Sequence, residues 1–276
     1  MDEDAATSAS PRGPIRRRLK WMLLGALAVL LLAVCFTIGP LLVEPNSYAH
    51  VTTIERRADY RDPRLIDAAW ALPVARRYRR GTYEFQDNPS FCGPASLANV
   101  LRSMGRNVSQ HRAIDGSEFE PWFGILIGGM TIDELAALVR DRTGRPVSIV
   151  RNLTLVQFRA ELAQSNDPAF RYIVNFHRGP LFGRGHGHFS PILGYLADRD
   201  LVLVGDVNAD YRPFLVHSET LWRAANTIDS ATGRGRGLIR IDAHPLPRIA
   251  MPCCIAGSHT TFRPRVGDPS TGKGES

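Results

Sequence analysis

Residues 86–101 read QDNPSFCGPASLANVL and place Cys92 at the start of a predicted helix. Apolar residues recur there at the spacing of a buried helical face, Pro94 suits the first turn, and Gly105 suits the end. Free backbone N–H groups and the positive end of the helix dipole favour a thiolate at the start of a helix, and the thiolate is the nucleophilic form of cysteine. Because free cysteines are also among the most buried residues, a small core residue is the alternative interpretation, and this segment by itself leaves both open.

The composition is that of a folded protein with a basic surface. Of the 276 residues, 44% are hydrophobic and 22% are charged, which suits one domain of about 200 residues with its own core. The net charge of +7 comes from arginine-rich clusters without a nucleic-acid-binding motif, so we expect anionic ligands or lipid headgroups and no nucleic-acid partner. The four cysteines, at positions 35, 92, 253 and 254, are too few for a disulfide scaffold and lack the spacing of a zinc site, so we predict no metal site.

The N-terminal region has the pattern of a membrane anchor. Residues 1–20 form a basic tail, and residues 21–43 carry no charge, which is long enough to cross a hydrocarbon layer of ~30 Å as a helix. The positive-inside rule then predicts a single-pass membrane protein with a cytoplasmic N-terminus and an extracytoplasmic (periplasmic) domain. A cleaved signal peptide is the alternative, which the long apolar run disfavours. Lipidation at Cys35 is disfavoured because Val34 is large for a lipoprotein motif and the cysteine lies in the middle of the run.

The rest of the chain predicts an α+β domain. We expect a linker over residues 44–64, a main domain over 65–242, and a loosely ordered tail over 243–276. Helices come first and an antiparallel sheet follows. The predicted elements around the Cys92 helix are helices near 65–72, 131–143 and 155–164, and strands near 146–150, 171–177, 188–195 and 201–207.

The last two predicted strands form a hairpin that carries two further polar residues. His188 lies near the start of the first strand and Asp206 near the end of the second. Strict pairing would leave them three positions out of register, so we expect a β-bulge or a diagonal contact. His188 has two other interpretations, a satisfied sheet histidine or a metal pair with His186, although no third ligand is evident. Asp206 at a strand end is ordinarily a turn residue.

The order of these residues is that of papain-like enzymes, with a helix-borne cysteine followed by a histidine and an aspartate. In that arrangement the histidine deprotonates the thiol and later protonates the leaving amine, while the carboxylate orients the imidazole. An oxyanion donor is also required.

Short blocks of sequence then make a more specific resemblance. The blocks are Phe85-Gln86, residues 91–97 (FCGPASL), His177-Arg178-Gly179, residues 187–192 (GHFSPI), Gly194-Tyr195, Asp206-Val207 and residues 228–233 (IDSATG). Together they resemble the phytochelatin synthase family over roughly residues 65–242, which implies that this part is a phytochelatin synthase-like catalytic domain with a papain-like fold. The resemblance further implies that a γ-glutamylcysteinyl acyl-enzyme forms from glutathione, with release of glycine, and passes its acyl group to a second glutathione or to water.

The resemblance also assigns roles. It makes Cys92 the nucleophile, His188 the general base, Asp206 the orienting carboxylate, and Gln86, six residues before the cysteine, the oxyanion donor. For the substrate it implies contacts from four further residues, Gly93, Gly187, Arg178 and Arg212. No cofactor is implied, although heavy-metal ions such as cadmium or zinc are expected to act as metal-thiolates.

Two departures from the family bear on the reaction. Plant-type members carry an arginine where this chain has Ala209, so we expect Arg178 or Arg212 to compensate, and the cysteine-rich C-terminal extension is missing. We therefore expect a mainly hydrolytic enzyme that acts on glutathione and is linked to thiol-peptide or heavy-metal handling. The alternatives are a papain-like peptidase with another peptide substrate, and a non-catalytic thiol or metal-binding module that uses Cys253 and Cys254.

Overall fold

The computed structural model describes residues 13–42, 47–119, 121, 124–126 and 128–243, and within the first of these ranges it describes side chains only for 18–34. Apart from residue 243, the predicted tail lies outside the described residues, and so do Cys253 and Cys254.

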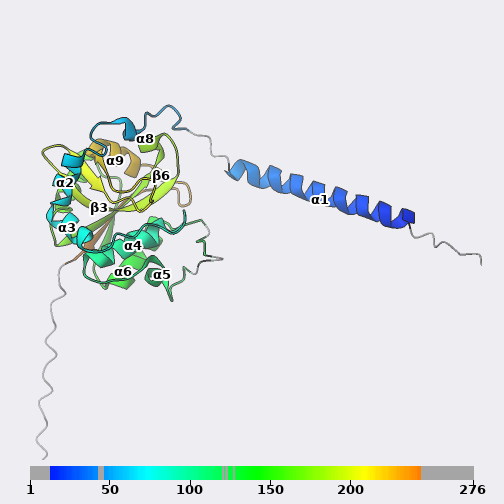
Figure 1. Cartoon of the computed structure of the whole chain (residues 1–276), viewed down its shortest axis with the longest axis horizontal. Coiled ribbons are helices and arrows are strands. Elements are labelled where there is room, and N and C mark those ends of the chain that lie inside the picture. Colours follow the sequence, from blue (N-terminus) through cyan, green and yellow to red (C-terminus); the bar gives the residue numbers. More distant parts are fainter. Residues whose placement is uncertain (1–12, 43–46, 120, 122–123, 127, 244–276) are drawn as a thin grey trace, which may run out of the picture. The chain divides into compact units, whose positions relative to one another are not determined.

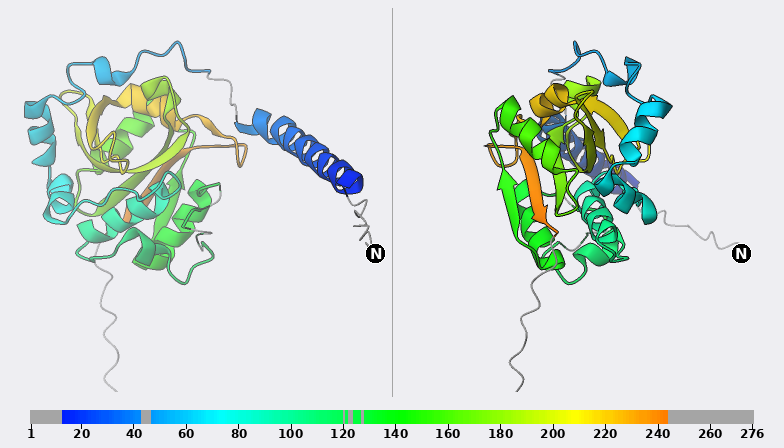
Figure 2. Two further views of the ribbon diagram at one scale, coloured as in Figure 1. Left: turned by 45° about the vertical axis from the view of Figure 1, so that its right-hand side comes forward. Right: turned by 90° about the vertical axis from the view of Figure 1, so that its left-hand side faces the viewer.

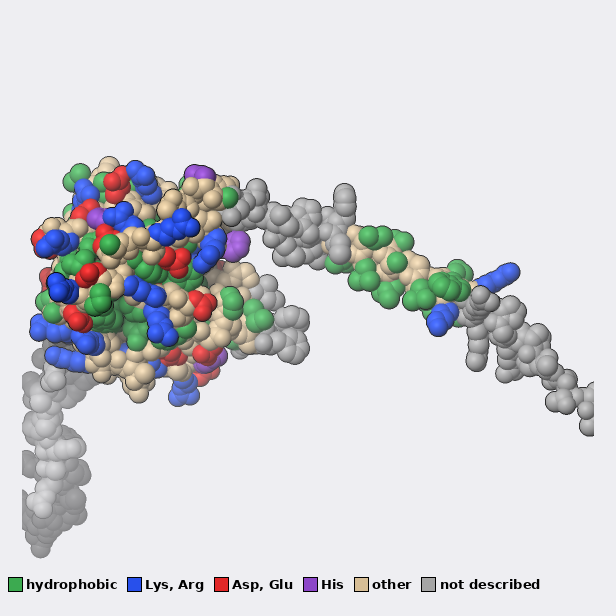
Figure 3. Space-filling view, turned by 45° about the horizontal axis from the view of Figure 1, so that its top comes forward, with side chains coloured by type: hydrophobic (Ala, Val, Ile, Leu, Met, Phe, Trp, Pro, Cys, Tyr) green, Lys and Arg blue, Asp and Glu red, His purple; other side chains and the backbone are tan. Residues whose placement is uncertain are grey.

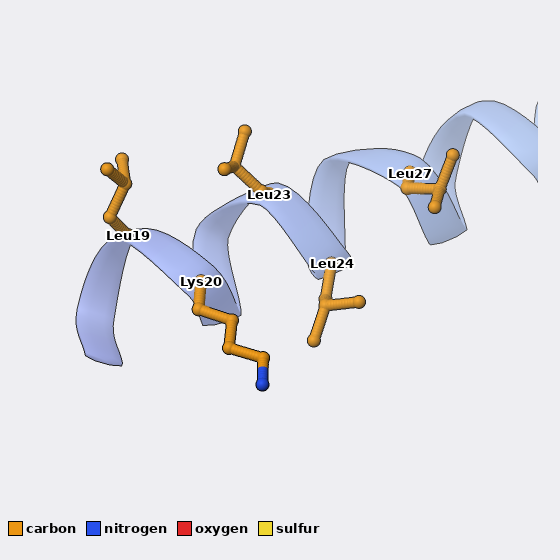
Figure 4. Close-up of a pocket in the computed structure, with 5 residues that line it drawn as sticks. All are labelled: Leu19, Lys20, Leu23, Leu24 and Leu27. Atoms are coloured by element: carbon orange, nitrogen blue, oxygen red, sulfur yellow. The ribbon is translucent and has the colours of Figure 1, made fainter. Parts of the chain in front are cut away.

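The N-terminal region forms one helix, α1 (Gly13–Leu42). Among the described residues, no helix is both long and apolar enough to cross a membrane, so the membrane span predicted at residues 21–43 is not supported. Val43 lies outside the described residues. Figure 4 shows a shallow apolar surface on α1, lined by Leu19, Lys20, Leu23, Leu24 and Leu27, which one helix forms alone.

A six-stranded antiparallel sheet is the centre of the domain, which confirms the predicted α+β class (Figure 1). Its strand order is β1-β8-β2-β3-β4-β5, so the last long strand of the sequence is inserted between the first two. The strands are β1 (Val147–Val150), β2 (Phe170–His177), β3 (Gly187–Leu196), β4 (Leu201–Val204), β5 (Phe214–His217) and β8 (Gly237–Asp242); β6 (Ile228–Asp229) and β7 (Arg234–Gly235) form a separate pair.

Helices pack on both faces of the sheet (Figure 2). They are α2 (Pro63–Trp70), α3 (Pro73–Arg80), α4 (Cys92–Ser103), α5 (Gln110–Ile114), α6 (Ile132–Thr143), α7 (Leu155–Gln164), α8 (Gly179–Phe182) and α9 (Ser218–Ala225), with a 3-10 turn, η1 (Ile54–Arg56). Strand β2 shows how the core divides, because Ile173 joins the apolar cluster under α4 and α6 while Tyr172 and Val174 join the cluster under α7 and α9. Alternate residues of a strand point to opposite faces, so burial on both sides gives β2 a nearly continuous buried run.

Capping residues set the ends of α6 and α7 where the sequence predicts them. Thr131 and Glu134 form a reciprocal capping box at the start of α6, and Gly144 ends that helix with a φ of +63°. Thr154 and Gln157 cap α7 in the same way. The helix α3 was not predicted because its four arginines mask the spacing of the buried residues Val74, Ala75 and Tyr78.

The predicted bulge is present in the β3–β4 hairpin. Gly194 pairs with Leu203, but the next pair is Ile192 with Val204, so Leu193 is an extra residue on β3. The ladder continues past β4, because Gly205 N–H donates to the carbonyl oxygen of Pro191 at 2.8 Å.

The described surface of the domain is mixed in charge. On the face that Figure 3 presents, Lys and Arg side chains alternate with Asp and Glu. The net positive charge therefore does not gather into one patch on that face.

Candidate active site

A cleft of ≈ 1330 Å³ runs between the start of α4 and the β2–β3 end of the sheet. Cys92, Met130 and Glu134 line it from the helical side, and Asn175, His177, His186, Gly187, Phe189 and Arg236 line it from the sheet. Such a concave space with a nucleophile in its wall is the expected setting of an active site.

Cys92 is the first residue of α4 and is half-buried. Burial raises the pKa of its thiol, but the hydrogen bond and the charge of His188 outweigh this effect, and the pKa is lowered from its usual value. The backbone of Phe189 and the charge of Arg178 act in the same direction. The site therefore favours the nucleophilic thiolate.

His188 and Asp206 meet behind the thiol. Nε2 of His188 lies 3.1 Å from Oδ1 of Asp206, and both side chains are buried. Burial lowers the pKa of His188. The charge of Asp206 raises that pKa, as do the hydrogen bonds that His188 makes with Asp206 and Cys92, and the pKa is raised overall. The structure thus brings together the three residues that the chain order predicts, with the imidazole between the thiol and the carboxylate.

Arg178 completes the surroundings of Asp206. Its Nη2 donates to both carboxylate oxygens, at 2.9 and 2.8 Å, and the backbone N–H of Asn208 donates to Oδ1 at 2.8 Å. Burial raises the pKa of Asp206, but the charge and hydrogen bond of His188, the charge of Arg178 and the backbone hydrogen bond from Asn208 lower it below its usual value. The carboxylate is therefore held ionised in the interior.

A second buried arginine lies in the cleft wall, at a position for which the sequence predicts no role. Arg236 donates from Nη1 to Oδ1 of Asn175 at 3.1 Å and lies 3.6 Å from the Asp229 carboxylate. Its guanidinium packs on Gly187, where an added Cβ would lie 2.7 Å from Nη1. The IDSATG block contains Asp229, but no local pattern in the sequence pairs that residue with an arginine seven positions later.

The segment before α2 adds a further part of the wall. The Tyr48 ring lies 4.9 Å from the His177 ring and covers Gly179, where no side chain would fit. Ile54 and Tyr60 of the same segment are buried, although the sequence predicts a linker there.

A family model described as Phytochelatin synthase matches residues 78–238, which is more than half of the chain. The chain belongs to the phytochelatin synthase family. Similar relatives include glutathione gamma-glutamylcysteinyltransferase 3 of Lotus japonicus, which is 37% identical over 171 residues covering 58% of this chain and 36% of the relative. Another is glutathione gamma-glutamylcysteinyltransferase 1 of Triticum aestivum, 34% identical over 170 residues, with 58% and 34% covered. The chain thus spans about a third of the length of these curated relatives.

Solved structures give more distant likenesses. The peptidase domain of Streptococcus ComA is 18% identical with a TM-score of 0.40, and covers 58% of this chain and 96% of that domain. A C39-like peptidase from Bacillus anthracis is 15% identical with a TM-score of 0.40, and covers 58% of this chain and 93% of that one.

The four residues predicted to contact the substrate of this phytochelatin synthase family member have different surroundings in the structure. Gly187 lines the cleft, whereas Arg178 and Arg212 are not among the described residues that line it. The guanidinium of Arg178 is engaged by Asp206, and that of Arg212 is exposed and donates to the carbonyl oxygen of Ala209. Gly93 packs against Met130, where an added Cβ would lie 3.1 Å from the sulfur.

Gln86 lies beside the segment that follows β4 and carries Asp206. Its backbone N–H donates to the carbonyl oxygen of Val207 at 2.7 Å, and its side-chain Oε1 is buried without a hydrogen-bond partner. It is not among the described residues that line the cleft, so its role as an oxyanion donor stays a prediction. Within the described part of the chain, no group of three His, Cys, Asp or Glu side chains could hold a metal ion.

Proposed function

We propose that this chain is a papain-like, cysteine-dependent acyltransferase and hydrolase that removes glycine from glutathione. The observation that carries the proposal is the hydrogen bond between the Cys92 thiol and His188, whose Nε2 lies 3.1 Å from Asp206, at the wall of a cleft. The names of the relatives support glutathione as the substrate.

The reaction follows from this geometry. The Cys92 thiolate attacks the carbonyl carbon of the cysteinyl–glycine bond, the C–N bond breaks, and His188 gives its proton to the departing glycine amine. Water or the amine of a second thiol peptide then attacks the thioester, neutral His188 takes the proton, and the thiolate leaves. Gln86 is the proposed donor to the oxyanion of each tetrahedral intermediate.

Arg236 and Asp229 are the proposed contacts of the glutamyl end of the substrate. That end carries a carboxylate and an ammonium group, which match a guanidinium and a carboxylate held side by side in the cleft wall. Both protein groups are mostly buried, so their attraction to a bound zwitterion is weakly screened by water. These two residues take the place of Arg178 and Arg212 as the expected substrate contacts.

The proposed outcome with glutathione alone is mainly hydrolysis. A positioned acceptor must reach the thioester before water does, and Ala209 stands where plant-type members carry an arginine. Activation by cadmium or zinc as metal-thiolates, and a role in metal handling, belong to the same proposal.

Incubation with glutathione followed by mass spectrometry tests the reaction. We expect glycine and γ-glutamylcysteine in near-equal amounts, and a γ-glutamylcysteinyl adduct on Cys92 after acid quenching. Cys92→Ser is the matched control and should give neither. Mainly longer thiol peptides would overturn the hydrolytic preference, and cleavage of other peptides with glutathione left intact would instead indicate a peptidase.

The extracytoplasmic location stays a prediction from the basic residues before the apolar run. A reporter fused after Ser276 should be active only outside the cytoplasmic membrane. Activity of the reporter in the cytoplasm would contradict it.

A further inference from the structure

Arg178 directly follows β2 and is 6% exposed. Its Nη2 donates to both oxygens of Asp206, which is fully buried. Oδ1 of Asp206 thus receives bonds from Arg178, His188 and the backbone of Asn208, whereas Oδ2 receives one from Arg178 alone. The arginine therefore fixes the half of the carboxylate that the histidine does not reach.

The guanidinium is itself held by aromatic rings. It lies 4.0 Å from the centre of the Tyr211 ring, with Phe182 at 5.6 Å and Phe176 at 5.8 Å. Gly185, in the loop between α8 and β3, has a φ of +94° and lies against the aliphatic part of the Arg178 side chain. A Cβ added at Gly185 would lie 3.0 Å from the Cβ of Arg178. An arginine stacked in this way has little freedom to turn toward a ligand in the cleft.

We propose that Arg178 is a positioning residue, which fixes Asp206 against His188 through the reaction cycle and does not bind substrate. The need for it rests on the proposed function, because His188 is neutral after it has protonated the leaving glycine. At that stage His188 carries no charge to balance Asp206. Without Arg178 the buried carboxylate would then be unpaired, which is costly. The permanent charge of Arg178 balances Asp206 in both protonation states of His188.

The same arrangement predicts how the site responds to pH. Beyond the effects of burial and of the direct partners, the Arg178 charge lowers the pKa of both the Cys92 thiol and the His188 imidazolium. Removal of that charge should therefore move the thiolate–imidazolium range toward higher pH. The titratable groups around this centre are Cys92 from α4, His188 from β3, Asp206 after β4, Tyr211 before β5, and Tyr60 and Tyr83, both of which sense the Asp206 charge.

The test compares Arg178→Met and Arg178→Lys in the full chain with Arg199→Met, which removes an exposed arginine from the β3–β4 turn. For Arg178→Met we expect kcat to fall about 10²- to 10³-fold with KM within about threefold, and Arg178→Lys should recover part of the loss. Alkylation of Cys92 by iodoacetamide, followed by mass spectrometry of its peptide, should move to higher pH in Arg178→Met and not in Arg199→Met.

Alkylation needs no substrate, so it separates this proposal from the proposed function. A chain that leaves glutathione intact but shows the shifted profile would support the positioning role and overturn only the reaction. A raised KM with unchanged kcat and an unchanged alkylation profile would overturn the proposal and make Arg178 a substrate contact. If Arg178→Met does not fold, Tyr211→Ala replaces it, because that variant removes the ring stacked on the guanidinium. Its alkylation profile should move to higher pH by a smaller amount. An unchanged alkylation profile in Tyr211→Ala would overturn the proposal.

Discussion

Two arginine–aspartate pairs lie near one end of the same sheet, and they differ in how tightly they are closed. Arg178 and Asp206 approach to 2.8 Å with side chains 8% and 0% exposed, whereas Arg236 and Asp229 are 3.6 Å apart with side chains 7% and 12% exposed. Only the second arginine lines the cleft. The difference indicates that charge and burial alone do not identify a substrate contact, because Arg178 is both charged and buried but binds Asp206 and does not line the cleft.

The two aspartates should separate most clearly. Asp206→Asn removes the carboxylate that orients His188 and stabilises its charged form, so we expect kcat to fall about 10³- to 10⁴-fold. Asp229→Asn should mainly raise KM, because its carboxylate is proposed to meet the substrate ammonium group. Steady-state kinetics with glutathione measures both, and a large loss of kcat in Asp229→Asn would remove the distinction between the pairs.

The loose arginine gives the next largest effect. Arg236→Gln keeps a donor for Asn175 but loses the charge proposed to hold the substrate carboxylate. We expect KM to rise about 10- to 100-fold with kcat nearly unchanged. Isothermal titration of glutathione into Cys92→Ser, with and without Arg236→Gln, measures the same loss without turnover, and equal affinities would contradict the assignment.

Gly187 offers a gentler way to disturb the same pair. An alanine Cβ there would lie 2.7 Å from Nη1 and 3.0 Å from Cζ of Arg236, so the guanidinium must move away from its place beside Asp229. We expect Gly187→Ala to raise KM roughly 3- to 10-fold. Gly81→Ala is a suitable control, since its nearest contact would be an ordinary 3.5 Å to Arg102. Equal kinetics in the two variants would show that the position of Arg236 is unimportant.

The tight pair should have the smallest measurable effect, on stability in acid. The pKa of Asp206 is lowered in the folded state, so its stabilising contribution is complete above the unfolded value of about 3.9 and is lost as the pH falls through the folded value. Urea unfolding at pH 6, 4 and 3 should show a free energy of unfolding that falls below about pH 4. The fall should be shallower in Asp206→Asn, with a remainder from Asp59 and Asp200, whose pKa values are also lowered. Parallel curves for the two proteins would contradict this contribution.

Local signals made much of the fold predictable. The capping residues of α6 and α7 and the hairpin turn after β3 act within a few residues, so their elements match the prediction closely. Chain order also led to Cys92, His188 and Asp206. The position of β8 between β1 and β2 depends instead on pairing between residues about 90 apart, such as Val147 with Ile241, which no local pattern records.

The partners of the arginines were predicted less well for a related reason. The sequence shows that Arg178 and Arg236 are basic but not which carboxylate each one meets, and in the structure Arg178 stacks on Tyr211 and meets Asp206. The sequence predicts Arg178 as a substrate contact, whereas its guanidinium lies against Asp206 in the structure. The arginine-rich clusters of the sequence predict a basic surface, yet Arg236, which lies in one of them, is 6% exposed.

The extra residue in β3 gives the site an odd–even dependence. With Leu193 bulged out, the β3–β4 ladder pairs Gly205 with Pro191, which sets Asp206 opposite Ser190, two positions from His188 and on the same side of the sheet. In a regular ladder continued from Gly194 and Leu203, Asp206 would lie opposite Pro191 and point to the other side. The imidazole of His188 would then have no carboxylate beside it. The count of residues between the histidine and the aspartate is thus as much a part of this active site as their identities.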